Sequence, residues 1–138
     1  VVDRHGIPLA VQLLAANAHD STRLVSSVDD IPPIIWPRGR PGRPRKRPAK
    51  LHADEAYDSA ENRRALGDRG ITPRIARRGM DSSERLGLHR WVVERTFAWM
   101  LGCRRFGVRY ERRADLLVGL LHLACALITV RFLDPATG

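Results

Sequence analysis

Cysteine is scarce in this chain. The two cysteines, Cys103 and Cys125, stand apart in apolar, helix-prone stretches, and no Cys-x-x-Cys pair occurs. The residues given contain no secretory leader, so we expect reduced thiols in a cytosolic protein. This scarcity argues against a fold held together by disulfides and leaves no zinc site to propose.

A hydrophobic run long enough for a membrane span is also lacking. The most apolar stretch, Leu116–Val130, has 15 residues and contains a glycine, a histidine and a threonine. A membrane span needs about 20 residues, so we predict a buried core helix there and no membrane partner. With 138 residues, 43% of them hydrophobic, the chain has the length of one domain and enough apolar residues for a core, which excludes wholesale disorder.

Lysine is nearly absent among the cations. Of the 24 lysines and arginines, 22 are arginine, and 15 acids leave a net charge of +9. The planar guanidinium group matches phosphate better than an ammonium group does. The composition therefore predicts a polyanionic partner.

Acids are missing altogether from the segment between Arg38 and Lys50. Proline recurs there, which excludes helix and central strand, so we predict an extended, solvated basic linker over residues 37–50. Its Arg-Gly-Arg-Pro string resembles the core of AT-hook peptides, which bind the minor groove. The simpler alternative, which we favour, is a flexible linker that attracts phosphate without specificity. The expected DNA-binding cations are Arg38, Arg40, Arg43, Arg45, Lys46, Arg47 and Lys50.

Apolar periodicity and turn residues predict alternating strands and helices, without an internal repeat. This order is typical of a mixed α/β layer protein. The predicted elements are a hairpin over 1–16 with its turn at 3–6, a helix from Asp20 that Pro32 ends, a strand at 51–53, a helix at 60–66 capped by Ser59, a strand at 71–77, and helices at 83–103 and 114–133.

Two acids stand out. Asp54 follows the predicted strand at 51–53, although Glu55 and Asp58 are nearby alternatives. Glu94 lies in the helix at 83–103, four residues after Arg90. This spacing also suits a surface ion pair, but the apolar residues around Glu94 favour a partly buried face and a metal ligand. His52 shares the strand face of Asp54, and we interpret it as a structural hydrogen-bonding residue.

Several motifs, in order, resemble those of DDE transposases of small bacterial insertion sequences. The resemblance covers almost the whole chain. The motifs are Val-Asp-Arg-His-Gly-Ile-Pro-Leu-Ala at 2–10, Ala-Asn-Ala-His-Asp-Ser at 16–21, Gly-Arg-Pro-Arg at 42–45, His-Ala-Asp-Glu-Ala-Tyr-Asp at 52–58, Arg-Arg-Gly at 77–79 and Arg-Trp-Val-Val-Glu-Arg-Thr-Phe-Ala-Trp at 90–99.

The resemblance implies an RNase H-like mixed sheet flanked by helices, in which three acids hold two Mg²⁺ (or Mn²⁺) ions. Asp54 resembles the second acid and Glu94 the third, both as catalytic metal ligands. Arg90 matches the arginine of the family's Tyr-x-x-Arg-x-x-x-Glu signature, although Gly87 stands at its tyrosine position. The hairpin at 1–16 matches the second and third strands of the fold, and Asp3 falls in its turn. We therefore expect residues 1–138 to be a partial catalytic domain without the first strand and first acid, and inactive alone.

The function implied by the resemblance is DNA cleavage and strand transfer by a transposase. The implied partners are the DNA ends of the element and its target, with self-association into a homo-oligomer, in a cytoplasmic, nucleoid-associated location. Arg104 and Arg105 follow the Glu94 helix and extend the predicted DNA-binding surface. Two alternatives stay open: a non-catalytic basic nucleic-acid-binding protein, and a nuclease of the same fold.

Overall fold

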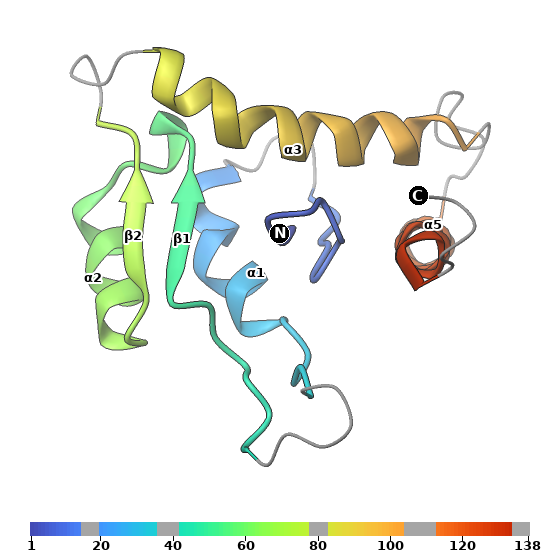
Figure 1. Ribbon diagram of the computed structural model, residues 1–138, viewed down its shortest axis with the longest axis horizontal. Coiled ribbons are helices and arrows are strands. Elements are labelled where there is room, and N and C mark those ends of the chain that lie inside the picture. Colours follow the sequence, from blue (N-terminus) through green and yellow to red (C-terminus); the bar gives the residue numbers. More distant parts are fainter. Residues whose placement is uncertain (15–19, 36–41, 78–82, 104–112, 134–138) are drawn as a thin grey trace. The chain divides into compact units, whose positions relative to one another are not determined.

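The computed structural model describes residues 1–14, 20–35, 42–77, 83–103 and 113–133 (Figure 1). At Asp20 and over residues 83–89 it describes the backbone alone. The chain forms two compact units, residues 14–86 and residues 1–13 with 87–138. Each unit is described by itself below.

The unit of residues 14–86 is built on two parallel strands. Strand β1 (Lys50–Ala53) pairs with β2 (Thr72–Ile75), with Lys50 opposite Thr72 and Ala53 opposite Ile75. Parallel strands need a crossover connection, and helix α2 (Ala60–Asp68) supplies it (Figure 1). The α/β class and the position of both strands confirm the prediction.

One side of this unit holds its core. Helix α1 (Leu24–Asp29) follows the 3-10 turn η1 (Asp20–Arg23) and contacts α2. The helix start expected at Asp20 is thus a 3-10 turn. Helix α1 ends at Asp29, before Pro32, because the residue that precedes a proline disfavours the helical conformation. The buried apolar side chains of this unit are Leu24, Val28, Ile31, Leu51, Leu66, Ile71, Ile75 and Ala76.

Helix α2 begins and ends through identifiable caps. The Ser59 hydroxyl oxygen accepts a hydrogen bond from the backbone N–H of Asn62, which confirms the predicted N-cap. The helix runs through Gly67 to Asp68, two residues beyond the predicted end. Gly70, with φ of +70°, ends it, and the N–H of Ile71 then bonds the carbonyl of Leu66.

The unit of residues 1–13 with 87–138 begins with a tight turn. Val2 and Pro8 form an antiparallel bridge, and Oδ1 of Asp3 accepts hydrogen bonds from the N–H groups of His5 and Ile7. The predicted hairpin is therefore present, in a short form with one bridge in place of two full strands. Gly6, with φ of +87°, completes the turn, and the structure gives Asp3 the role of a turn residue.

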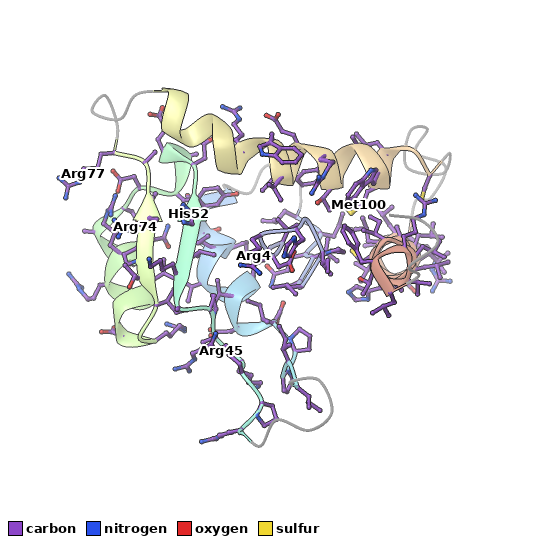
Figure 2. The ribbon with its side chains drawn as sticks, viewed as in Figure 1. Arg4, Arg45, His52, Arg74, Arg77 and Met100 are labelled. Atoms are coloured by element: carbon purple, nitrogen blue, oxygen red, sulfur yellow. The ribbon has the colours of Figure 1, made fainter. Side chains whose placement is uncertain are left out.

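Two helices complete this unit. Helix α3 (Ser83–Leu101) ends two residues before the predicted boundary, whereas α5 (Ala114–Leu133) has the predicted bounds. Met100 of α3 packs against Ala124 and Ile128 of α5, with both cysteines and Trp99 at the edge of this cluster. Figure 2 shows Met100 directed toward α5.

The prediction that the C-terminal apolar run is a buried helix is wrong for most of α5. The only buried residues of this helix are Ala124 and Ile128, because a single stripe of it packs on α3. The helix has 20 residues, and its most apolar window has a mean hydropathy of 2.2, so by length and composition it could cross a membrane. Only 11% of the residues in that window are buried. A core helix of a soluble protein passes the same test. Its exposed large apolar residues are Leu116, Leu123, Leu127, Val130, Phe132 and Leu133.

Candidate functional site

Asp54 lies where the sequence places it, directly after β1. Its backbone is extended, and its Oδ1 accepts a 2.7 Å hydrogen bond from the N–H of Glu55, which starts the 3-10 turn η2 (Glu55–Tyr57). The side chain is exposed, and among the described residues nothing donates to Oδ2. One oxygen thus fixes the carboxylate while the other stays available to a cation.

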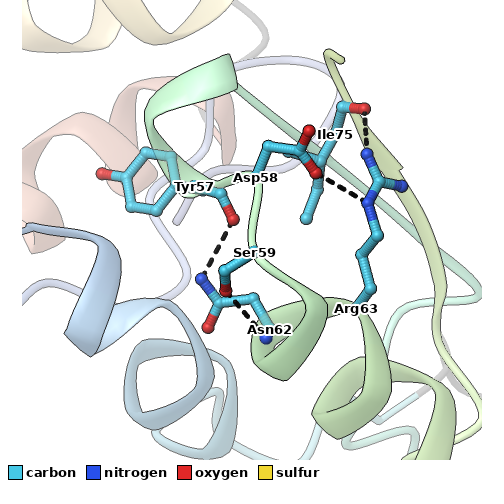
Figure 3. Close-up of polar contacts among 6 residues, drawn as sticks. All are labelled: Tyr57, Asp58, Ser59, Asn62, Arg63 and Ile75. Atoms are coloured by element: carbon cyan, nitrogen blue, oxygen red, sulfur yellow. Dashed lines mark hydrogen bonds and ion pairs between the residues drawn. The ribbon is translucent and has the colours of Figure 1, made fainter. Parts of the chain in front are cut away.

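Hydrogen bonds around α2 fix the turn that follows Asp54 (Figure 3). The buried Asn62 amide donates to the carbonyls of Tyr57 and Ser21, at 3.0 and 3.2 Å. Arg63 binds the Asp58 carboxylate at 2.7 Å and donates to the carbonyl of Ile75 in β2. Asp58 is thus paired with Arg63, whereas among the described residues no cation pairs with the Asp54 carboxylate.

A polar face of the sheet adjoins Asp54. Strand alternation exposes Lys50 and His52 of β1 and Thr72 and Arg74 of β2, and His52 lies opposite Arg74 (Figure 2). Arg77 follows β2 and is also exposed. Neither Arg74 nor Arg77 is among the binding residues predicted from the sequence. The alternation of polar and apolar residues in 72–75 is the signal that could have identified Arg74.

Glu94 and Arg90 form an exposed ion pair on α3. Nε of Arg90 lies 3.1 Å from Oε1 of Glu94, and the side chains are 67% and 65% exposed. The expectation of a partly buried Glu94 is therefore wrong. Val92, Thr96 and Met100 are buried on the other side of the helix, which turns Glu94 toward solvent.

The donor chemistry of Asp54 and Glu94 suits Mg²⁺, which prefers carboxylate oxygens. Within the described ranges, no group of three or more histidines, cysteines and acids is gathered tightly enough to hold a metal ion. Asp54 belongs to the unit of 14–86 and Glu94 to the other unit. Their roles as metal ligands, and the role of Arg90, stay predictions.

The structure describes the basic linker from Gly42 onward, and all of its residues from there to Lys50 are exposed except the half-buried Pro48. It is not simply extended, because Arg45 and Ile34 exchange two backbone hydrogen bonds of 2.9 Å, which return the segment onto the residues after α1. The pKa of Asp29 is lowered by its hydrogen bond from Arg69, and further by the charges of Arg47 and Lys46. Four predicted DNA-binding residues lie outside the described residues: Arg38, Arg40, Arg104 and Arg105.

Comparison with known proteins identifies the family of this chain. The sequence is 50% identical over 128 residues to a Burkholderia cepacia protein named as a candidate transposase for insertion sequence element IS402. The match covers 93% of this chain but 59% of that relative. No solved structure matches the chain significantly. Residues 1–129 match the transposase DDE domain family, and the chain belongs to that family.

Proposed function

We propose that this chain is part of a transposase that cleaves DNA and joins the ends to a target by phosphoryl transfer. The match to the transposase DDE domain over residues 1–129 carries this proposal. The strand-end position of Asp54, with one carboxylate oxygen available, supports it. In this proposal residues 1–138 form part of an RNase H-like catalytic domain, which in its complete form includes another strand and another acid.

Asp54 and Glu94 are the proposed ligands of Mg²⁺ or Mn²⁺. When bound, such ions stabilise the entering and leaving oxygens of an in-line displacement. Asp54 offers a carboxylate whose orientation is fixed by the N–H of Glu55. Glu94 is held by Arg90, so binding a metal ion requires it to exchange that exposed ion pair for the ion. Arg90 is then free to contact a phosphate oxygen.

The proposed DNA surface consists of the basic linker and the exposed face of the sheet. The described cations of the linker are exposed, and Lys50 connects the linker to β1. Arg74 and Arg77 extend this positive surface past the end of β2 (Figure 2). Such a surface binds the DNA backbone by releasing counterions, so affinity falls steeply with salt. Arg38, Arg40, Arg104 and Arg105 are proposed as further contributors.

We also propose a homo-oligomer in the cytoplasm, associated with the nucleoid, with α5 packed against protein and not against lipid. The mean hydropathy of α5 alone does not separate these environments, because a core helix has the same composition. The DNA partner and the excess of arginine favour a location at the nucleoid.

A strand-transfer assay tests the proposed activity. DNA carrying the ends of the element is incubated with Mg²⁺ or Mn²⁺ and the protein translated from its whole open reading frame. We expect joined products, which Asp54→Asn and Glu94→Gln each abolish, whereas the exposed Glu61→Gln on α2 leaves joining intact. The chain of residues 1–138 alone is expected to bind DNA without joining it; joining by this chain would place the missing acid within it.

The products also separate the two alternatives. A nuclease would release free ends without joined strands and would still need Asp54. A non-catalytic binding protein would yield neither product, and its DNA affinity would survive Asp54→Ala.

A further inference from the structure

Two segments of the unit of residues 14–86 pair beyond the ends of α1 and β1. Ile34 and Arg45 exchange two backbone hydrogen bonds of 2.9 Å and form an isolated antiparallel bridge. In the view of Figure 1, residues 33–35 and 42–47 extend away from the helices and strands of this unit. We call residues 33–35 and 43–47 the basic ribbon.

The bridge determines which side chains share a face of the basic ribbon. Ile34 and Arg45 are directly opposite each other, so their side chains lie on the same face. Ile35 is the next residue and belongs to the other face, where Pro44 stands opposite it. Pro44 fits there because a non-hydrogen-bonded position of an antiparallel pair needs no N–H from it. One face of the ribbon thus carries two apolar residues.

The apolar face of the basic ribbon is open to solvent. Ile35 is 77% exposed, the largest fraction among the exposed large apolar side chains in the described part of the chain. Pro44 is exposed as well. A single exposed isoleucine needs no special explanation, but the charges around this one restrict the partner that can cover it.

The surroundings of Ile35 are positive. The exposed cations of the ribbon are Arg43, Arg45, Lys46 and Arg47. No acid occurs between residues 31 and 53, and the preceding Asp29 accepts hydrogen bonds from Arg69 through both carboxylate oxygens. A second copy of the chain placed on this surface would bring like charges together, which disfavours self-association here. Charge complementarity therefore favours a polyanion.

DNA accounts for both the charge and the apolar face. Proteins that bind the minor groove combine cationic contacts with apolar wedges, isoleucine and proline among them, which enter between base pairs and bend the duplex. An anionic membrane also attracts cations, but insertion of apolar residues into lipid is usual for an amphipathic helix. A two-stranded ribbon has the form of several known DNA-binding elements.

We propose that Ile35 is a wedge that enters a base step from the minor groove while the cations of the basic ribbon contact the flanking phosphates, so that the DNA is bent there. This inference rests on the proposed function. It assigns the bend to one apolar residue, whereas the cations supply the affinity.

The test measures bending by resonance energy transfer between dyes at the two ends of a duplex of about 30 base pairs. One duplex has TA steps at its centre and the other a run of adenines, which resists kinking. We expect the 138-residue chain to raise the transfer efficiency of the first duplex. It should bind that duplex roughly 3-fold to 30-fold more tightly than the second, since TA steps unstack more easily. The slope of log affinity against log salt should be equal for both, because the number of phosphates is unchanged.

Variants assign the bend to Ile35. Ile35→Ala should remove the rise in transfer efficiency and the preference for TA steps, while the salt slope is retained because every cation remains. Ile35→Phe should retain both, since phenylalanine also acts as a wedge. Ile34→Ala is the matched control, because Ile34 is 46% exposed but lies on the other face and should leave the bend unchanged.

A charge variant separates affinity from bending. Arg47→Ala should weaken binding to both duplexes alike and reduce the salt slope by about one unit. At saturating protein the transfer efficiency should equal that of the parent chain, because the wedge is intact.

The other outcomes overturn the proposal. Binding without bending, a bend that survives Ile35→Ala, or tighter binding to the run of adenines removes the wedge and leaves the proposed function standing. Equal loss of bending in Ile34→Ala and Ile35→Ala removes the assignment to one face. If Ile35→Ala weakens binding to phosphatidylserine vesicles and leaves DNA bending unchanged, Ile35 contacts lipid and is no wedge. Failure to bind either duplex overturns the proposed function and the wedge together.

Discussion

Asn62 and Thr96 are the buried polar side chains in the described part of the chain, and both bind backbone carbonyls. Thr96 lies 2.8 Å from the carbonyl of Gly6 and so fastens the N-terminal turn to α3. Asn62 connects α2 to the residues before α1 and to the turn after Asp54. At the scale of single residues, segments distant in sequence are joined by amide and hydroxyl groups that would be costly to bury unpaired.

Replacing Asn62 by alanine should lower the free energy of unfolding by about 1–3 kcal/mol, because two hydrogen bonds are lost and two carbonyls lose their donor. Urea denaturation followed by circular dichroism measures this change. Arg64→Ala is the matched control on α2; Arg64 is exposed, so its effect should stay within about 0.5 kcal/mol. Equal effects of the two variants would contradict the structural role of Asn62.

The ion pair between Asp29 and Arg69 predicts a pH dependence of stability. Arg69 donates to both carboxylate oxygens at 2.9 and 2.8 Å, which lowers the pKa of Asp29. The ionised carboxylate is thus favoured in the folded chain. Its contribution is fully present above the unfolded pKa of about 3.9 and is lost as pH falls through the lower folded value.

Urea denaturation between pH 2 and pH 6 measures this contribution. The free energy of unfolding should fall less between pH 4 and pH 2 in Asp29→Asn than in the parent chain, because the asparagine cannot titrate. Arg64→Ala keeps the ion pair and should retain the parent pH dependence. Identical pH profiles for Asp29→Asn and the parent would show that the pair does not persist in solution.

At the scale of helices and strands, short-range signals predicted most boundaries to within two residues. Ser59, which precedes a helix-prone run, correctly marks the start of α2. The end of α2 was predicted too early, since Gly67 is tolerated inside the helix and only Gly70 adopts a positive φ. A sequence shows that a glycine is present, but which glycine takes the left-handed conformation depends on the packing of Ile71 that follows it.

Burial was predicted less well than helix formation, because burial depends on which elements meet. For α5 the bounds were correct, yet only the stripe facing α3 is buried. For Glu94 the apolar neighbours suggested burial, but Trp91, Val93 and Phe97 are themselves exposed on α3. A helix that is apolar on all sides carries no periodic signal that identifies its packed face.

Two substitutions in α5 test this assignment of faces. Ile128→Ala should lower the free energy of unfolding by about 2–4 kcal/mol, because Ile128 is 5% exposed and packs on Met100. The adjacent Leu127, 52% exposed, should lose much less on replacement by alanine. Guanidinium denaturation measures both. A loss at Leu127→Ala as large as at Ile128→Ala would mean that the exposed stripe is covered in the folded chain in solution.

At the scale of the whole molecule, the two proposed metal ligands belong to different units of the chain. Sequence motifs identified Asp54 and Glu94 because each lies within a short local pattern. The structure adds that Asp54 is oriented by Glu55, that Asp58 is occupied by Arg63, and that Glu94 is paired with Arg90. No local pattern predicts whether carboxylates from distant parts of the chain converge, so the shared metal site of Asp54 and Glu94 stays a proposal.

Convergence of Asp54 and Glu94 on metal ions predicts coupled binding. Their carboxylates should lie within about 10 Å, since two metal ions about 3.5–4 Å apart span no more. Mn²⁺ binding to the chain, followed by the electron paramagnetic resonance signal of the free ion, should then weaken at least about tenfold in Asp54→Asn and in Glu94→Gln. The double variant should lose little more than either single variant, because removal of one carboxylate already disrupts the shared site.

Arg90→Ala should strengthen binding of Mn²⁺, since it frees Glu94 from its ion pair, and Glu61→Gln should have no effect. If instead the losses in Asp54→Asn and Glu94→Gln add fully, the two acids bind separate ions, and the shared site is excluded.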